Sequence, residues 1–239
     1  MSPVALITGA GRGLGAALAF KLAQDGFRVA VHYRSSAVGA DQTCATIREC
    51  GGIAEAFCAD LARDAEALAL AAAVASRFGR IDLLINNAGV YQERHGLQLS
   101  EAEWFAGLNS TVTQSFFTTR ACLPWLQKSQ LKRVVNIGDS SCDRPGARDL
   151  AWSYHIGKTG LWILTRSFAT QLAADGIAVN MVSPGLLENS IGDTGIERIP
   201  AGRLGNFDDI YQAIRFLALE APAYLSGSNL VVSGGWNLR

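Results

Sequence analysis

Short apolar runs alternate with longer stretches of helical periodicity along the whole chain. The runs are rich in Val, Ile, Leu and Ala, which is typical of strands that are buried on both faces of a sheet. We expect seven strands, over residues 4–7, 28–33, 53–58, 81–85, 133–137, 178–182 and 229–232.

The segments between these strands carry the period of amphipathic or buried helices. They predict helices over 14–24, 101–127, 152–174 and 207–219. Two more follow the second strand, ending at about residue 49, and the third strand, ending at residue 78. Strands that alternate with helices form a parallel sheet with helices on both faces. The pattern therefore predicts an α/β fold of the doubly wound (Rossmann) type, formed by residues 1–239 as a single domain.

One irregular segment stands out late in the chain. Residues 186–205 carry Gly and Pro and follow the sixth strand. Ligands of doubly wound folds bind beyond the carboxyl ends of the strands. We therefore expect this segment to be a lid over a ligand.

Composition narrows the class of protein. Of 239 residues, 49% are hydrophobic and 18% are charged, and the net charge is zero. This balance gives no reason to expect nucleic-acid or membrane partners. The small charged fraction suggests that other subunits cover part of the surface, so we expect a homo-oligomer.

The remaining composition points to a cytoplasmic protein. The five cysteines have no C-x-x-C spacing and only three His accompany them, so we expect reduced thiols and no metal site. The chain runs from its first residues straight into a strand, without the pattern of a signal peptide.

A glycine-rich turn follows the first strand and opens the first helix. It reads Thr8-Gly9-Ala10-Gly11-Arg12-Gly13-Leu14-Gly15. Glycine lets a chain turn tightly and approach a phosphate, and the helix N-terminus attracts the negative charge. This context predicts a dinucleotide site that includes Gly9, Arg12, Gly13, Leu14 and Gly15.

The end of the second strand distinguishes between the nicotinamide cofactors. Binders of NAD usually carry an acid there for the ribose 2′-hydroxyl. This chain has Arg34 and Ser35 instead, which together with Arg12 are suited to a 2′-phosphate. We therefore predict NADP(H). Asp60, at the end of the third strand, suits an adenine amino group or, alternatively, a helix cap.

Tyr154 and Lys158 are four residues apart in a predicted helix, so both project from one helix face. A neighbouring ammonium favours the phenolate form of tyrosine. We expect Lys158 to lower the pKa of Tyr154 and to make it a proton shuttle.

Together with these features, the chain resembles the short-chain dehydrogenase/reductase family. The matching residues run in order along the chain: the glycine turn, Asn86-Asn87-Ala88-Gly89, Asn109, Ser140-Ser141, Tyr154-x-x-x-Lys158 and Pro184-Gly185.

The resemblance implies roles for these residues. Tyr154 protonates a carbonyl oxygen, a serine polarises that oxygen, and Lys158 lowers the Tyr154 pKa and bonds the nicotinamide ribose. Asn109 holds a water that links Lys158 to solvent. Ser141 fits the family's spacing to the tyrosine better than Ser140. On the cofactor, Asn87, Ala88 and Gly89 shape the adenosine side, and Pro184 and Gly185 face the nicotinamide.

Two substrate classes fit the resemblance. The segment Arg203-Leu204-Gly205 is similar to reductases of 3-oxoacyl thioesters, which act on small or carrier-bound carbonyl compounds. His32-Tyr33-Arg34-Ser35 is similar to pteridine reductases, and Asp139 would bond the amino and NH groups of a pterin. The loop that holds Asp139, residues 138–145, is unusually polar.

Other residues flank these motifs. Tyr91, His95, Trp152 and Leu186 are expected to wall the substrate pocket.

By resemblance the assembly is a homotetramer or a dimer. A rival hypothesis is an NADP-sensing protein that keeps the fold without chemistry.

Overall fold

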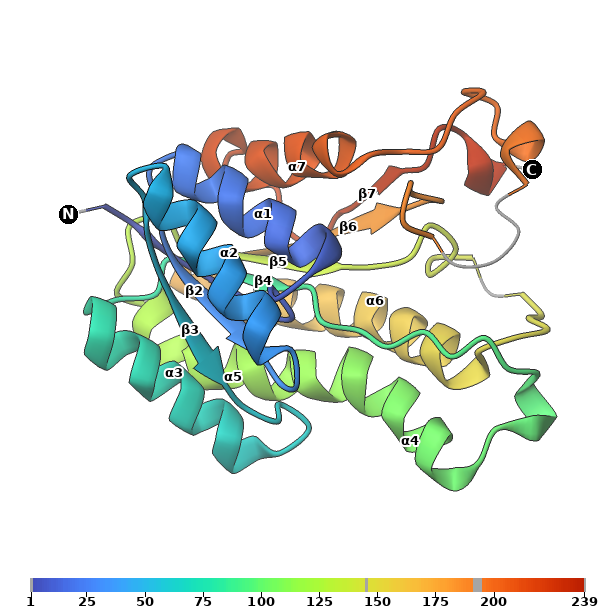
Figure 1. The fold of residues 1–239 in the computed structure, drawn as a ribbon, viewed down its shortest axis with the longest axis horizontal. Coiled ribbons are helices and arrows are strands. Elements are labelled where there is room, and N and C mark those ends of the chain that lie inside the picture. The colour runs from blue at the N-terminus through green and yellow to red at the C-terminus, as the bar shows by residue number, and fades with distance from the viewer. Residues whose placement is uncertain (1, 145, 191–194, 239) are drawn as a thin grey trace.

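The chain forms one seven-stranded parallel sheet in the order β3-β2-β1-β4-β5-β6-β7 (Figure 1). The computed structural model describes residues 2–144, 146–190 and 195–238. Every neighbouring pair of strands is parallel. The strands are β1 Val4–Ile7, β2 Arg28–Tyr33, β3 Ile53–Cys58, β4 Leu83–Asn86, β5 Arg133–Ile137, β6 Ala178–Pro184 and β7 Asn229–Val232.

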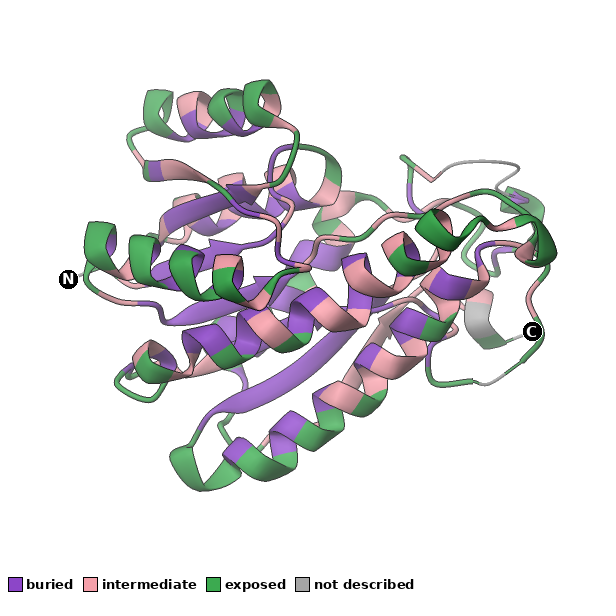
Figure 2. Ribbon diagram, turned by 90° about the horizontal axis from the view of Figure 1, so that it is seen from below, coloured by how far each residue is buried: buried purple, intermediate pink, exposed green. Residues whose placement is uncertain are grey.

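Seven α-helices in the described part of the chain cover the two faces of the sheet. They are α1 Gly13–Gln24, α2 Ala37–Glu49, α3 Asp64–Phe78, α4 Glu101–Leu108, α5 Gln114–Leu126, α6 Trp152–Leu172 and α7 Phe207–Arg215. Helices α1, α2 and α7 pack on one face and α3, α5 and α6 on the other, each set around its own apolar core (Figure 1). Figure 2 shows buried strands between helices whose outer faces are exposed. The doubly wound prediction is confirmed.

Local sequence explains where several helices begin and end. Asp64 and Glu66 lie in the first turn of α3, where they offset the helix dipole, and Gly79 ends the helix with a φ of 80°. Ser100 and Glu103 form a capping box at the start of α4. Asn206 and Asp209 cap α7 in the same way.

Some predicted boundaries were wrong. The fourth strand spans Leu83–Asn86 and not 81–85, and the sixth extends to Pro184. The helix expected over 101–127 contains a π-helical turn at Asn109–Thr113. Helix α7 ends in a second π turn at Phe216–Glu220, and α6 passes into a short 3₁₀ turn at Ala173–Asp175. These turns keep nearly helical backbone, so periodicity does not distinguish them. Further 3₁₀ turns span Gly96–Gln98, Ile196–Arg198 and Trp236–Leu238.

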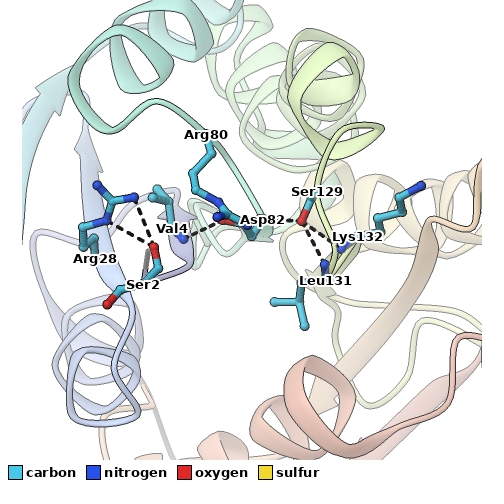
Figure 3. Close-up of polar contacts among 8 residues, drawn as sticks. All are labelled: Ser2, Val4, Arg28, Arg80, Asp82, Ser129, Leu131 and Lys132. Carbon is cyan, nitrogen blue, oxygen red and sulfur yellow. Dashed lines mark hydrogen bonds and ion pairs between the residues drawn. The ribbon is translucent and has the colours of Figure 1, made fainter.

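A buried carboxylate, that of Asp82, connects several segments at the amino-terminal edge of the sheet (Figure 3). Asp82 is fully buried and accepts hydrogen bonds from the Val4 amide (2.8 Å), the Arg80 guanidinium (2.6 and 2.7 Å) and Ser129 Oγ (2.5 Å). Ser129 Oγ in turn accepts from the amides of Leu131 and Lys132. Burial by itself raises the pKa of Asp82, but these donors outweigh it and hold the pKa below its ordinary value. The cluster ties β1, β4 and the turn before β5 together, far from the opposite edge.

The opposite, carboxyl edge is where the chain reverses direction across the sheet. From β1 the chain proceeds outward to β2 and β3 and then returns to β4 on the other side of β1. A crevice forms at such a switch point. The segment expected as a lid borders it, and two backbone hydrogen bonds of 2.9 Å, Gly205 N to Leu186 O and Glu188 N to Gly205 O, close its base. Residues 191–194 of that segment lie outside the described residues.

Two further observations concern the helices and the cysteines. No helix in the described ranges is long and apolar enough to span a bilayer. The five thiols are free; Cys44, Cys122 and Cys142 are buried, whereas Cys50 and Cys58 are exposed.

Candidate active site

A cleft of about 1130 Å³ opens at the carboxyl ends of the central strands. It brings together predicted residues that are as many as 172 positions apart in the sequence, from Leu14 to Leu186. The predicted residues that line it are Leu14, Asn87, Gly89, Tyr91, Asp139, Ser141, Tyr154, Lys158, Pro184, Gly185 and Leu186.

Tyr154 and Lys158 share one face of α6, as their spacing predicts. Lys158 Nζ lies 5.5 Å from the centroid of the Tyr154 ring. Gly89 faces both residues: a Cβ built on it would lie 3.8 Å from Lys158 Nζ and 3.9 Å from Tyr154 Cε2. The end of β4 and the first turns of α6 therefore meet at one point in the cleft.

Lys158 is buried and has a specific acceptor. Its Nζ donates a hydrogen bond of 2.5 Å to the main-chain oxygen of Ile137, at the end of β5. Burial lowers the pKa of Lys158 to about 8, against the opposing attraction of Asp139. The ammonium is thus fixed beside the cleft and is close to its titration range.

The expectation that the pKa of Tyr154 lies below its ordinary value is wrong for this structure. Burial raises the pKa of the Tyr154 phenol, and the negative charge of Asp139 raises it further. The ammonium of Lys158 is directed at the Ile137 carbonyl, and desolvation of the phenolate dominates. Tyr154 is consequently a neutral phenol, which can donate a proton.

Ser140 and Ser141 both line the cleft, but they are held differently. Ser140 is buried, and its amide donates to the Pro184 carbonyl (3.0 Å). The Ser141 hydroxyl donates to Asp139 Oδ1, which also accepts from the Ser141 amide (2.9 Å). Asp139 therefore orients the loop and the Ser141 hydroxyl.

The glycine turn and the segment after β4 are joined by hydrogen bonds. Thr8 Oγ1 accepts from the amides of Asn87 (2.9 Å) and Ala88 (3.0 Å), and Asn87 Nδ2 donates to the Thr8 carbonyl (2.9 Å). A Cβ on Gly9 would lie 2.9 Å from the Ala88 Cα, so only glycine fits there. Ala88 shapes this junction but does not line the cleft.

The start of α1 is suited to a pyrophosphate. The helix begins at Gly13, its N-cap Arg12 makes no side-chain cap, and its first turn has no acidic residue. The first amides of the helix and the positive end of its dipole are therefore not offset by an acidic or capping side chain of the helix itself. At Gly15 a Cβ would collide with the Gly9 carbonyl, which keeps the turn closed. These residues fit a dinucleotide.

The adenosine end is more open. Arg12, Arg34 and Ser35 are exposed and do not line the cleft. Asp60 is engaged locally: Oδ1 accepts from the Ala62 amide (3.2 Å), and Oδ2 lies 3.7 Å from Arg63 Nε. It forms a turn and does not cap α3, whose N-cap is Arg63.

Asn109 begins the π turn between α4 and α5 and is half-buried. It does not line the cleft. Its neighbour does approach Tyr154 and Lys158, because the Ser110 carbonyl lies 3.8 Å from the same Cβ position on Gly89. Ser110 Oγ also accepts from the Val90 amide (3.0 Å).

His32 supports the glycine turn, a role that sequence reasoning missed. Its Nδ1 accepts from the Gly9 amide (3.1 Å), and its Nε2 lies 3.1 Å from the Ala59 carbonyl. These partners require the neutral imidazole with the proton on Nε2. Burial lowers the pKa of His32 to about 4. A histidine at an inward position of a buried strand was the available signal.

Aromatic side chains wall the substrate side. Tyr91 packs edge-on against Tyr154, with ring centroids 5.2 Å apart, and His155 lies 5.4 Å from Tyr154. Trp152 lines an adjoining chamber and packs so closely on Gly96 that no Cβ fits there. His95 is exposed and lines neither space.

Several other residues that were not predicted as site residues also line the cleft. They are Arg144, Arg148, His155, Glu197, Arg198 and Trp236. Arg144 belongs to the polar loop of residues 138–145, whose composition was its only signal.

Comparisons with known proteins agree with this arrangement. A family model described as enoyl-(acyl carrier protein) reductase matches residues 9–237. A 3-oxoacyl-[acyl-carrier-protein] reductase of Synechocystis is 35% identical, and the match covers 97% of this chain and 96% of the relative.

Solved structures give the same result. An acetoin dehydrogenase from Enterobacter cloacae superposes with a TM-score of 0.88 at 29% identity, over all of this chain and 96% of the other. A double variant of a Serratia marcescens short-chain dehydrogenase/reductase has a TM-score of 0.89 at 28% identity, over 98% of each chain. Fold, site and relatives agree that this chain is a member of the short-chain dehydrogenase/reductase family, oxidoreductases that use a nicotinamide cofactor.

Proposed function

We propose that this protein is an NADPH-dependent reductase that transfers hydride to the carbonyl carbon of a 3-oxoacyl thioester or a similar ketone. The observation that carries the proposal is the meeting of Ser141, Tyr154 and Lys158 in one cleft that adjoins a glycine turn. A bound NADPH supplies the hydride.

Tyr154 is the proton donor in this proposal. Its phenol is neutral because burial raises its pKa, so it can hydrogen-bond a carbonyl oxygen and protonate it as negative charge develops. Ser141 polarises the same oxygen. The Asp139 carboxylate, which accepts from the Ser141 amide and hydroxyl, keeps that side chain in position.

Lys158 stabilises the tyrosinate that forms when the proton leaves. Its ammonium is close to the Tyr154 ring and is held by the Ile137 carbonyl. With a pKa of about 8, Lys158 can also pass a proton toward Tyr154. Asn109, at the π turn, would hold the water that connects Lys158 with solvent.

The preference for NADPH rests on the end of β2. Arg34 and Ser35 are exposed there, Arg12 lies exposed in the glycine turn, and no acid occupies residues 32–36. Two guanidinium groups suit a 2′-phosphate. Asn87, Ala88, Gly89, Pro184 and Gly185 would shape the rest of the cofactor site, and Asp60 would bond the adenine.

One observation favours a pteridine as the alternative substrate. Asp139 lines the cleft and is close enough to raise the pKa of Tyr154. Only one of its oxygens takes part in the two hydrogen bonds from Ser141. The other could accept from the amino and NH groups of a pterin, with Tyr91, Trp152 and Leu186 around the ring.

We also propose that the single domain of residues 1–239 assembles as a homodimer or tetramer. Phe105, Phe116, Ile156 and Ile163, on α4, α5 and α6, expose between a third and two thirds of their surface. Large apolar side chains on neighbouring helices are typical of subunit interfaces.

The test follows NADPH oxidation with an acetoacetyl thioester and, separately, with a 7,8-dihydropterin. Replacement of Tyr154 by Phe should lower turnover by about 100-fold or more while NADPH binding stays near the wild-type value. Tyr224→Phe, at a fully exposed position, is the control. Turnover of the dihydropterin alone supports the pteridine alternative. NADPH binding without turnover of either compound supports the NADP-sensing hypothesis.

A further inference from the structure

A second chamber, of about 380 Å³, adjoins the cleft on the side of α6. Asp139, Ser141 and Lys158 line both spaces, so the chamber reaches the residues assigned to the chemistry. Its other walls are the loop after β5 and the first two turns of α6, from Cys142, Arg144, Gly146, Ala147, Arg148, Trp152, His155, Ile156 and Thr159.

Arg148 is the notable wall residue. It is half-buried and lines both the chamber and the cleft. Among the described residues it forms no ion pair, and its one side-chain hydrogen bond is from Nη1 to the neighbouring Ala147 carbonyl (3.0 Å). Most of its donors are therefore available to a ligand.

The backbone of Arg148 is fixed although its charge is not neutralised. Trp152 Nε1 donates to the Arg148 carbonyl (2.6 Å), and the Trp152 ring packs on Gly96. The Asp149 carbonyl accepts from the Gly96 amide (3.2 Å), and the Ala151 amide donates to the Arg94 carbonyl (3.0 Å). The guanidinium is thus presented from an anchored loop.

The other charges around the chamber do not cancel this cation. The chamber lining includes one carboxylate, Asp139, but also two further cations, Arg144 and Lys158, so it keeps a net positive charge. The first turn of α6 contains no acidic residue, and its N-cap Ala151 offers no side-chain cap. His155 stays neutral, because burial lowers its pKa and Arg148 lowers it further, against the effect of Asp139.

We infer that the substrate carries an anionic group, a carboxylate or a phosphate, close to its carbonyl and that Arg148 binds this group. Because Asp139, Ser141 and Lys158 line both the chamber and the catalytic cleft, the anion belongs to a compact substrate. It is not a phosphate of the cofactor, since no residue of the glycine turn lines the chamber. The inference rests on the proposed carbonyl reduction and makes Arg148 a residue that determines specificity.

The first experiment measures binding without turnover. Titration calorimetry on the NADP-loaded protein compares butanoate, butyl phosphate and neutral butanamide. We expect an anion to bind more tightly than the amide, with Arg148→Gln weakening the anion about tenfold and Arg148→Lys weakening it less. The anion that binds more tightly identifies the group. Equal affinities for anion and amide, or an unchanged affinity in Arg148→Gln, would overturn the inference.

The second experiment measures selectivity during turnover. The ratio of kcat/KM for 3-oxobutanoate to that for its methyl ester should fall about tenfold in Arg148→Gln. Lys128→Gln, which removes one positive charge from an exposed site outside both spaces, should leave the ratio unchanged. Reduction of the ester with an unaltered ratio in Arg148→Gln would overturn the inference about Arg148 and would still support the reductase proposal. Anion binding that depends on Arg148, without reduction of any ketone, would support an anion site at Arg148 and overturn the reductase proposal.

Discussion

Lys158 Nζ donates a hydrogen bond of 2.5 Å to the main-chain oxygen of Ile137, and this bond fixes the charge on which the candidate site depends. The lysine is buried beside the phenol of Tyr154, and burial of its ammonium destabilises the folded protein. The pKa of Lys158 falls accordingly from an ordinary 10.5 to about 8. Such a shift corresponds to about 3 kcal/mol of lost stability below pH 8.

Lys158→Met should therefore make the protein inactive and more stable. Below pH 8 both the folded and the unfolded wild type carry the proton, and only the folded state carries it unfavourably. From pH 8 to 10.5 the unfolded chain binds more protons, so wild-type stability rises with pH relative to the variant. We expect the variant to gain about 1 to 3 kcal/mol at pH 7. Urea denaturation at pH 7 and pH 9 checks this, with Lys128→Met as the exposed control; a variant less stable than wild type at pH 7 would contradict it.

Arg34→Asp should shift cofactor preference from NADPH toward NADH. The substitution places an acid at the end of β2, where it accepts from a ribose 2′-hydroxyl and repels a 2′-phosphate. We expect the ratio of kcat/KM for NADPH over NADH to fall about tenfold or more. Lys128→Asp, the same charge reversal at a distant surface site, should not move the ratio. Unchanged selectivity in Arg34→Asp would remove Arg34 from the cofactor site.

Acid should loosen the glycine turn through His32. Its pKa is lowered from 6.5 to about 4, so the unfolded chain takes up the proton first as pH falls. The contribution of His32 to stability is complete above pH 6.5 and is lost toward pH 4, by about 3 kcal/mol. His32→Asn, which keeps a donor and an acceptor without titrating, should flatten this part of the profile. Urea denaturation between pH 7 and pH 4 measures it, with the exposed His95→Gln as control; parallel profiles for wild type and His32→Asn would refute the assignment.

Asp82→Asn should destabilise the fold and leave the chemistry intact. The amide cannot accept from the Arg80 guanidinium, the Val4 amide and Ser129 as the buried carboxylate does, so the half-buried Arg80 loses its partner (Figure 3). We expect a loss of about 2 to 4 kcal/mol at neutral pH. The pKa of Asp82 is lowered, so its contribution is present above about pH 4 and disappears on further acidification.

The matched control is Glu220→Gln, which breaks the exposed pair with Arg215 and should cost less than about 1 kcal/mol. Thermal unfolding compares the two variants, and steady-state kinetics at a temperature where both are folded compares their turnover. A fall in kcat of Asp82→Asn under those conditions would show that the cluster also acts on the opposite edge of the sheet.

Local patterns were sufficient for the strands and for most of the candidate site. The run at β1 is apolar throughout because helices cover it on both faces, and this signal is present in four consecutive residues; β4 is apolar up to its last residue, Asn86. The glycine turn is readable because tight turning and the approach of Ala88 demand glycine at one position. The spacing of Tyr154 and Lys158 follows from the helical repeat alone.

Features that depend on burial required the tertiary structure. From the sequence we expected a lowered pKa for Tyr154, because the sequence shows the neighbouring cation. It does not show that the phenol is removed from solvent, and this burial raises the pKa instead. The bridge from His32 to Gly9 spans 23 residues, and the chamber at Arg148 exists only where the loop after β5 meets α6. The sequence by itself determined the elements and the chemical groups, because periodicity and steric demands are local. The tertiary structure decided protonation, support and the shape of the substrate side, because desolvation and long-range hydrogen bonds arise only when distant segments pack together.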